Sequence, residues 1–246
     1  MPRSTAGPVR PTASNPSSAH AEGAAARAEI ESAREHVAAL VAAKPAEVVF
    51  TGGATESNNL AIFGVARAAE ESRRHLVTSA AEHPSVEAPL AALEAEGFRV
   101  TRVPVDADGL LDPDAVAVSL TPETSLVSIL WANNETGVVQ PIARIAERVR
   151  ARGVPLHVDA TQAIGRIAVR LDEVPADLLS ASAHKFNGPK GVGFLVVRGE
   201  RALVPWLRGG SQERGRRGGT QNVPGIAGLG GAFLGDAPVI GERVEA

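Results

Sequence analysis

The chain alternates short apolar runs with longer segments of helical periodicity, and this alternation restricts its fold more than any other feature. Strand and helix signals in alternation are typical of a mostly parallel sheet covered by helices, so we expect an α/β fold. Helices are expected near residues 22–42, 55–71, 84–96 and 141–152. Strands are expected near residues 47–50, 75–79, 98–103, 126–131, 154–158, 177–182 and 192–198.

A lysine stands just after one of the predicted strands. Ser182-Ala183-His184-Lys185 closes an apolar run, and Gly188-Pro189-Lys190-Gly191 follows it. An amine held at the end of a buried strand can form a Schiff base with an aldehyde, which indicates a site for pyridoxal phosphate. A lysine after an apolar stretch is also common as the first solvated residue of a loop. Lys185 alone does not decide between the two.

An aspartate follows the strand predicted upstream of Lys185. The apolar residues near 154–158 predict a short buried strand, which places Asp159 at its carboxyl end. Open α/β sheets bind ligands at that edge. A carboxylate there could keep a pyridine nitrogen protonated, and Gln162 could donate to the phenolic oxygen of the same ring. Asp159 could equally cap the next helix.

A loop with two glycines, residues 51–55, joins a predicted strand to a predicted helix. Glycines allow the backbone to approach an anion, and the free N–H groups and dipole of a helix start attract phosphate. The segment has neither the Lys-Ser/Thr pair of a P-loop nor the third glycine of a dinucleotide fingerprint. We expect it to bind phosphate in a different way, with a plain strand-to-helix turn as the alternative.

Seven stretches, taken in order, resemble the cysteine desulfurases of the class V aminotransferase group. The resemblance runs from about residue 15 to about residue 235, and seven ordered motifs are far more specific than any one of them. The stretches lie at residues 15–20, 53–59, 82–83, 133–140, 157–162, 182–185, and 212–214 with 219–220.

The resemblance implies a role for each candidate residue. Lys185 would link covalently to pyridoxal phosphate, and Asp159 would pair with the pyridinium nitrogen. Gln162 would contact the phenolic oxygen, while His83 would stack on the ring and assist proton transfer. The remaining expected contacts are Ala54, Thr55, Ser182 and His184 at the phosphate, Thr220 reaching it from the partner subunit, and Asn134 beside the ring and the substrate carboxylate.

The resemblance also implies a fold and an activity. Residues 15–235 would form the three-layer large domain of a fold-type I pyridoxal-phosphate enzyme, with strand 192–198 antiparallel to the others. Residues 1–14, rich in proline and serine, are expected to be disordered, and residues 236–246 to begin a further, largely missing small domain. The implied reaction converts L-cysteine to L-alanine and transfers sulfur for iron-sulfur cluster or thio-cofactor assembly. A homodimer and a sulfur-acceptor or scaffold protein are the implied partners.

The 246 residues contain no cysteine, whereas the family uses a thiolate to accept the sulfur. The sequence therefore leaves two other hypotheses open. One is a different class V enzyme, such as a selenocysteine lyase. The other is a non-catalytic paralogue that dimerises and contributes Thr220 to its partner's site.

The composition argues against several other classes of function. A net charge of −3 indicates no dedicated nucleic-acid or membrane surface, and no apolar run approaches the roughly 20 residues of a spanning helix. The arginine and glycine residues of 208–219 could bind single-stranded nucleic acid, but Gln212 and Glu213 interrupt them. The six histidines lack metal-ligand spacing; His20 and His83 lie nearest functional positions, while His75 and His157 are expected to be structural. We expect a cytoplasmic protein without a metal.

Overall fold

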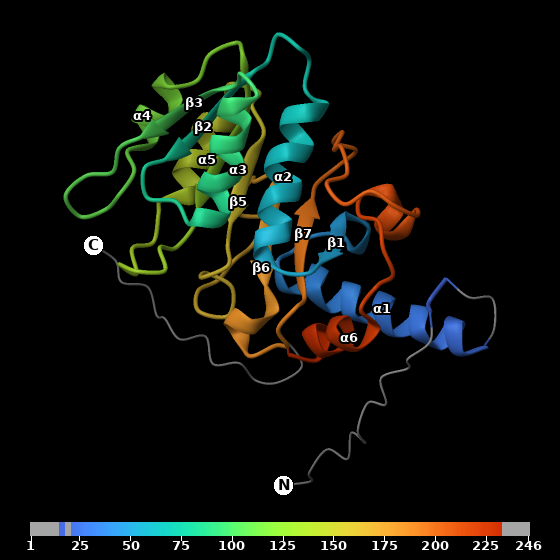
Figure 1. Ribbon diagram of the computed structural model, residues 1–246. Coiled ribbons are helices and arrows are strands. Elements are labelled where there is room, and N and C mark those ends of the chain that lie inside the picture. The colour runs from blue at the N-terminus through green and yellow to red at the C-terminus, as the bar shows by residue number, and fades with distance from the viewer. Residues whose placement is uncertain (1–14, 18–20, 233–246) are drawn as a thin grey trace, which may run out of the picture.

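A seven-stranded sheet forms the centre of the molecule (Figure 1). The computed structural model describes residues 15–17 and 21–232, so the predictions for residues 1–14, for His20 and for residues 236–246 lie outside the described residues. The strand order is β1-β7-β6-β5-β4-β2-β3. The strands are β1 (Val48–Thr51), β2 (His75–Ser79), β3 (Arg99–Val103), β4 (Thr124–Leu130), β5 (Leu156–Asp159), β6 (Leu178–Ser182) and β7 (Gly193–Val197).

Helices cover both faces of this sheet and produce three layers (Figure 1). One face carries α2 (Ala54–Ala68) and α3 (Pro84–Ala95). The other face carries α1 (Ala21–Leu40), α4 (Pro113–Val118), α5 (Ile142–Arg150) and α6 (Val223–Gly231). Three short 3₁₀ turns, η1 (Pro45–Glu47), η2 (Ala183–Phe186) and η3 (Gln212–Gly215), complete the described elements.

Strand β7 illustrates how the sheet separates two apolar cores. Phe194 and Val196 pack into the core shared with α1, α5 and α6, whereas Leu195 and Val197 pack into the core under α2 and α3. Successive side chains of a strand point to opposite faces, so a strand covered on both sides must be apolar throughout. This explains the continuous apolar runs that identified the strands in the sequence.

The direction of the strands brings several carboxyl ends to one edge of the sheet. β7 is antiparallel to both of its neighbours, β1 and β6, and the other described strand pairs are parallel. The mostly parallel α/β fold and the antiparallel strand near 192–198 are therefore confirmed. β1, β5 and β6 consequently end at the same edge.

Two helices were absent from the sequence prediction. α4 has only six residues and is capped by the preceding Asp112, whose side chain accepts the N–H of Asp114. α6 contains four glycines, which lower helix propensity. It forms because Val223, Ile226 and Leu229 pack into the core beside α1. Among the described residues, no helix is long and apolar enough to cross a membrane.

Candidate functional site

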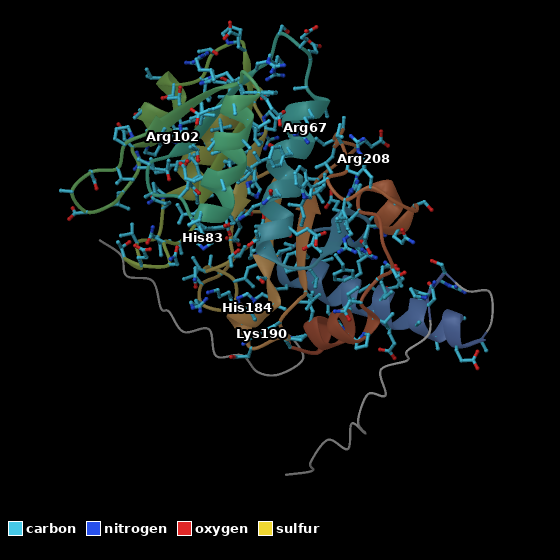
Figure 2. The ribbon with its side chains drawn as sticks, in the orientation of Figure 1. Arg67, His83, Arg102, His184, Lys190 and Arg208 are labelled. Carbon is cyan, nitrogen blue, oxygen red and sulfur yellow. The ribbon has the colours of Figure 1, made fainter. Side chains whose placement is uncertain are left out.

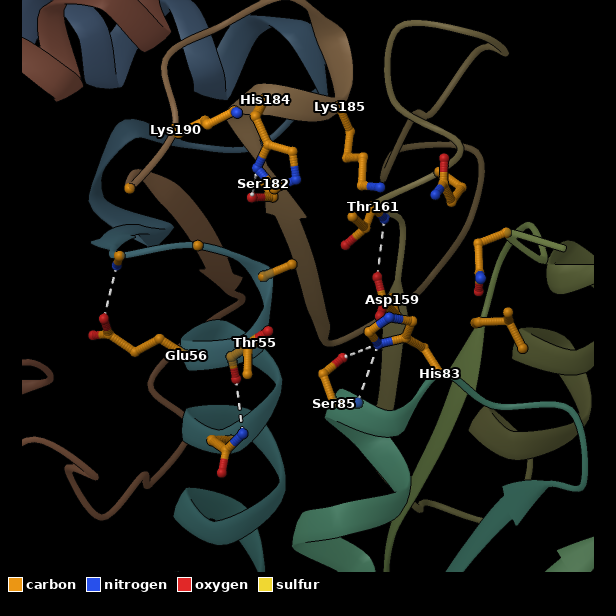
Figure 3. Close-up of a pocket in the computed structure, with 18 of the residues that line it drawn as sticks. Thr55, Glu56, His83, Ser85, Asp159, Thr161, Ser182, His184, Lys185 and Lys190 are labelled. Atoms are coloured by element: carbon orange, nitrogen blue, oxygen red, sulfur yellow. Dashed lines mark hydrogen bonds between the residues drawn. The ribbon is translucent and has the colours of Figure 1, made fainter.

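A cavity of about 810 Å³ opens at the carboxyl edge of the sheet (Figure 3). Its volume is in the range of small-molecule sites, and its position beyond the strand ends is where open α/β sheets bind ligands. Nine of the ten predicted site residues line it: Ala54, Thr55, His83, Asn134, Asp159, Gln162, Ser182, His184 and Lys185. The tenth, Thr220, is exposed on the loop after η3 and does not line this cavity.

Figure 2 shows the whole molecule with its side chains and labels three residues that line the cavity, His83, His184 and Lys190. His83, His184 and Lys190 gather toward one end of the molecule, whereas Arg67 and Arg102 lie toward the other. The polar side chains of the cavity therefore come from different elements that meet at one edge of the sheet. Among the described residues, no group of His, Asp and Glu is placed to hold a metal ion.

Asp159 lies at the floor of the cavity, as the last residue of β5. It is only 6% exposed, yet its carboxylate has two donors. Thr161 N–H donates to Oδ1 at 2.9 Å, and Asn58 Nδ2 donates to Oδ2 at 2.7 Å. Two donors compensate the burial of the charge and hold the carboxylate in a fixed direction.

Lys185 enters the cavity from η2, directly after β6. β6 is buried at every position, so the chain must leave the sheet before a charged side chain can reach solvent. Asn187, with φ of 66°, ends the turn in the left-handed conformation that asparagine tolerates. In Figure 3 the Lys185 side chain points toward Thr161 and Asp159. Lys190 lines the same cavity.

The start of α2 and the loop before it line one side of the cavity. Gly53 is the residue before the helix and has φ of 148°, a conformation that side chains disfavour. Gly193 of β7 allows the loop to pack closely, because a Cβ there would lie 2.7 Å from Gly53 Cα. The free N–H groups of the first turn therefore lie beside Ser182, whose Oγ is 2.9 Å from His184 Nδ1.

His83 stands before α3 on the side of the cavity nearest Asp159 (Figure 3). Its Nδ1 accepts the N–H of Ser85 at 3.1 Å, so the ring also caps α3. The preceding Glu82 accepts Ser79 Oγ at 2.6 Å and the Leu130 N–H at 3.0 Å. Glu82 thereby ties the His83 loop to the ends of β2 and β4.

Burial raises the pKa of Glu82 to about 8, against an ordinary value of 4.5. Desolvation is the largest cause and outweighs the donors from Ser79 and Leu130, and the charge of Asp159 acts in the same direction as burial. Burial therefore favours the protonated form of Glu82. This buried acid lies within a motif identified from the sequence, but its protonation depends on neighbours from distant strands.

His157 confirms the expectation of a structural histidine inside the sheet. It is fully buried, with Nδ1 2.8 Å from Ser128 Oγ and Nε2 bonded to Ser180 Oγ. Burial lowers the pKa of His157 to about 4, so the ring is neutral at physiological pH. His75 is likewise buried at the start of β2, bonded to Thr124 and Thr101.

The arginine and glycine segment at 208–219 is held largely by ion pairs. Glu213 is buried, and Arg34 donates to it at 2.9 and 3.2 Å. Arg217 donates to Glu56 at 2.7 and 3.2 Å, and Glu56 also accepts the Gly52 N–H at 2.7 Å. These contacts attach the segment to α1 and to the start of α2, so Arg217 is engaged within the protein and less available to a nucleic acid.

Several lining residues were absent from the sequence prediction, namely Ser85, Lys190, Trp206 and Leu207. Trp206 stacks on Phe63 of α2, with ring centroids 4.5 Å apart. The only sequence signal for Trp206 and Leu207 is their large apolar side chains just before a polar, glycine-rich segment. That pattern does not by itself indicate a cavity.

Comparison with known proteins places these features in a family. Residues 9–234 match the family model described as "Aminotransferase class-V". A protein named "Cysteine desulfurase IscS" from Dictyoglomus turgidum is 47% identical over 219 residues, which are 89% of this chain and 56% of that protein. One of the same name from Anaeromyxobacter dehalogenans is 50% identical over 218 residues, 88% of this chain and 54% of that protein.

Solved structures give the same result. The structure titled "SspA in complex with cysteine" aligns with a TM-score of 0.88 at 44% identity, covering 91% of this chain and 65% of that one. The structure titled "NIFS-LIKE PROTEIN" aligns with a TM-score of 0.88 at 42% identity, covering 91% of this chain and 62% of that one. The chain spans about half the length of the curated relatives it matches. With its family model matched from residue 9 to residue 234, the chain belongs to the class-V aminotransferase family, whose cysteine desulfurases are pyridoxal-phosphate enzymes.

Proposed function

We propose that this chain supplies the pyridoxal-phosphate site of a cysteine desulfurase-type enzyme. One observation carries the proposal: the Lys185 amine, the Asp159 carboxylate and the first turn of α2 all line one cavity. Their chemistry fits the cofactor, which has an aldehyde, a ring nitrogen and a phosphate. Family membership and the similarity to cysteine desulfurases support the same assignment.

The donor set of the cavity fits each part of that cofactor. Ala54 and Thr55 in the first turn of α2, with Ser182 and His184 opposite, would donate to the phosphate. Asp159 would accept the ring N–H, and Gln162 would donate to the phenolic oxygen. His83 would lie against the ring face, and Asn134 would contact the ring and the substrate carboxylate.

When bound, the cofactor would supply an electron sink for the pair of electrons left when a bond to the substrate Cα breaks. The residues of the chain have simpler tasks. Lys185 Nζ would hold the aldehyde carbon covalently, and Asp159 would keep the ring nitrogen protonated. His83 Nε2 is the ring atom of that imidazole left free of the Ser85 contacts, so it would exchange protons with the substrate.

The proposed substrate is L-cysteine, with L-alanine and transferred sulfur as products, and iron-sulfur cluster or thio-cofactor assembly as the purpose. The similarity to a structure titled as a complex with cysteine supports this choice. The 246 residues contain no cysteine, so a thiol that accepts sulfur has to come from outside this sequence. Sulfur transfer by this chain alone is therefore not part of the proposal.

The proposed assembly is a cytoplasmic homodimer that meets a sulfur-acceptor or scaffold protein. Thr220 is exposed and lies outside the cavity lining, which supports its donation to the phosphate of a second subunit. Trp206 and Leu207 are 42% and 41% exposed at the rim of the cavity and offer an apolar surface for that contact. We propose residues 15–235 as the domain that carries these groups.

Titration of the chain with pyridoxal phosphate, followed by the visible absorbance of the bound cofactor, tests this function. We expect a saturable band for the wild-type chain, a greatly weakened one for Asp159→Ala, and a change in the band when L-cysteine is added. L-Valine serves as the control amino acid. A chain that gives no band, or a band that L-cysteine leaves unaltered, contradicts the proposal, and a response to selenocysteine alone favours the lyase alternative.

A further inference from the structure

A chain of hydrogen bonds joins His83 to Asp159 through two side chains that the proposed function does not use. Asn58 Nδ2 lies 2.7 Å from Asp159 Oδ2 and 2.8 Å from Ser85 Oγ. Ser85 Oγ lies 2.7 Å from His83 Nδ1, as drawn in Figure 3. Asn58 is fully buried and Ser85 is 7% exposed, so water competes little for these groups.

The Asp159 carboxylate fixes the direction of the first hydrogen bond in this chain. An ionised carboxylate only accepts hydrogen bonds, so Asn58 must turn its NH₂ group toward Asp159 Oδ2. In this orientation Asn58 Oδ1 is buried and has no hydrogen-bond partner in the part of the chain that the structure describes. An unpaired buried acceptor is unfavourable. The contact with Asp159 therefore decides the orientation of the amide.

The second amide hydrogen of Asn58 is then donated to Ser85 Oγ. A hydroxyl that accepts this bond still has its own hydrogen to give, and the nearest acceptor is His83 Nδ1.

The contacts of the His83 ring also indicate that Nδ1 accepts a hydrogen bond. The backbone N–H of Ser85 lies 3.1 Å from His83 Nδ1, and a backbone N–H can only donate. The backbone N–H and the Ser85 hydroxyl together make His83 Nδ1 an acceptor. Because one nitrogen of a neutral imidazole accepts while the other carries the proton, the proton of His83 is on Nε2.

We propose that Asn58 and Ser85 are positioning residues that hold His83 in the neutral tautomer protonated on Nε2. Asp159 orients Asn58, Asn58 orients the Ser85 hydroxyl, and that hydroxyl joins the backbone N–H in occupying Nδ1. His83 thus presents an N–H donor to the cavity. The effect of that donor on a bound ligand rests on the proposed function, whereas the tautomer belongs to the free chain.

Nitrogen-15 NMR of the ligand-free chain, labelled at histidine, measures the tautomer directly. We expect a single His83 tautomer protonated on Nε2, with its signals assigned by their loss in His83→Gln. Ser85→Ala keeps the backbone N–H but removes the hydroxyl, so the Nδ1-protonated fraction should rise about fivefold, as for one lost hydrogen bond. Ser125→Ala is the matched control, since it removes a buried hydroxyl that donates to the His75 carbonyl at the other end of the sheet.

A wild-type His83 protonated mainly on Nδ1 overturns the inference, and so does an identical tautomer mixture in the wild-type chain and in Ser85→Ala. Asn58→Leu provides a second variant, because it keeps the branched outline of the side chain, at a larger volume, and removes both amide N–H donors. It should raise the Nδ1-protonated fraction in the same direction as Ser85→Ala and bind pyridoxal phosphate about tenfold more weakly, since Asp159 loses one donor. Circular dichroism verifies that each variant is folded.

The two proposals fail in different ways in these measurements. A chain that binds no pyridoxal phosphate but retains the single Nε2-protonated tautomer contradicts the proposed function and leaves this inference standing. A chain that binds the cofactor while Asn58→Leu leaves the His83 signals unchanged contradicts the inference and leaves the proposed function standing.

Discussion

Replacement of Glu82 by glutamine should make the chain more stable at high pH and alter it little at low pH. The pKa of Glu82 is raised from 4.5 to about 8 in the folded state, chiefly by burial. Between these values the folded chain holds a proton that the unfolded chain releases, so the free energy of unfolding falls as the pH rises. Below pH 4.5 the contribution is fully present, and above about pH 8 it is lost.

The rise of the Glu82 pKa from 4.5 to about 8 corresponds to a pH-dependent change in the free energy of unfolding of at most about 5 kcal/mol. Glutamine resembles the uncharged acid in shape, and its Oε1 can accept both the Ser79 hydroxyl hydrogen and the Leu130 N–H, as Glu82 Oε1 does. The variant therefore keeps the contacts and loses the pH dependence. We expect the free energy of unfolding of Glu82→Gln minus that of the wild type to increase by several kcal/mol from pH 5 to pH 9.

Urea unfolding followed by tryptophan fluorescence at intervals from pH 5 to pH 9 measures this difference. Glu71→Gln, at an exposed position in the turn between α2 and β2, is the control and should give a difference that is constant with pH. The reasoning is refuted if Glu82→Gln follows the wild type within about 1 kcal/mol at every pH, a difference typical of a surface substitution. A variant that loses stability as the pH rises would indicate an ionised Glu82 stabilised by its donors.

Two further predictions concern packing and charge. Glu213→Ala removes the buried carboxylate from Arg34, which keeps only the exposed Glu31, and should lower the free energy of unfolding by about 3–5 kcal/mol in urea. A loss below about 1 kcal/mol would mean that the pair is not buried in solution. Gly193→Ala places a Cβ 2.5 Å from the Ala181 carbonyl oxygen and should lower the melting temperature and weaken cofactor binding. Gly231→Ala in α6 is the control for Gly193→Ala, because its Cβ meets nothing within 4 Å, and it should be neutral or slightly stabilising. Equal melting temperatures for the two variants would contradict the packing argument.

Most of the sheet could be predicted because its strands, apart from the edge strand β3, are buried along their whole length and centre on apolar residues. β2 has the predicted bounds, residues 75–79, and the other strands differ by a few residues at their ends. α6 could not be predicted in the same way, because its glycines disfavour a helix in isolation. A Cβ on Gly230 would lie 2.7 Å from Ala33 Cα, so the small residues serve a close contact with α1 that the local sequence does not reveal.

The site residues could be predicted where a motif places a functional group directly after a strand, as with Asp159 and Lys185. Their supporting contacts could not. Asn58 donates to Asp159, which lies 101 residues further along the chain, and to Ser85, which lies 27 residues further along. Only the packing of α2 in the folded chain brings these residues together. Thr220 remains a prediction, since its proposed role needs a second subunit.

Reduction of the chain with borohydride in the presence of pyridoxal phosphate, followed by peptide mass spectrometry, tests most directly whether the cavity binds the cofactor as proposed. The chain has three lysines, Lys44, Lys185 and Lys190, so the modified residue is identified without ambiguity. We predict one adduct, on Lys185, which persists in Lys190→Ala and disappears in Lys185→Ala. An adduct that forms on Lys190 or Lys44 instead, or no adduct at saturating cofactor, would contradict the account.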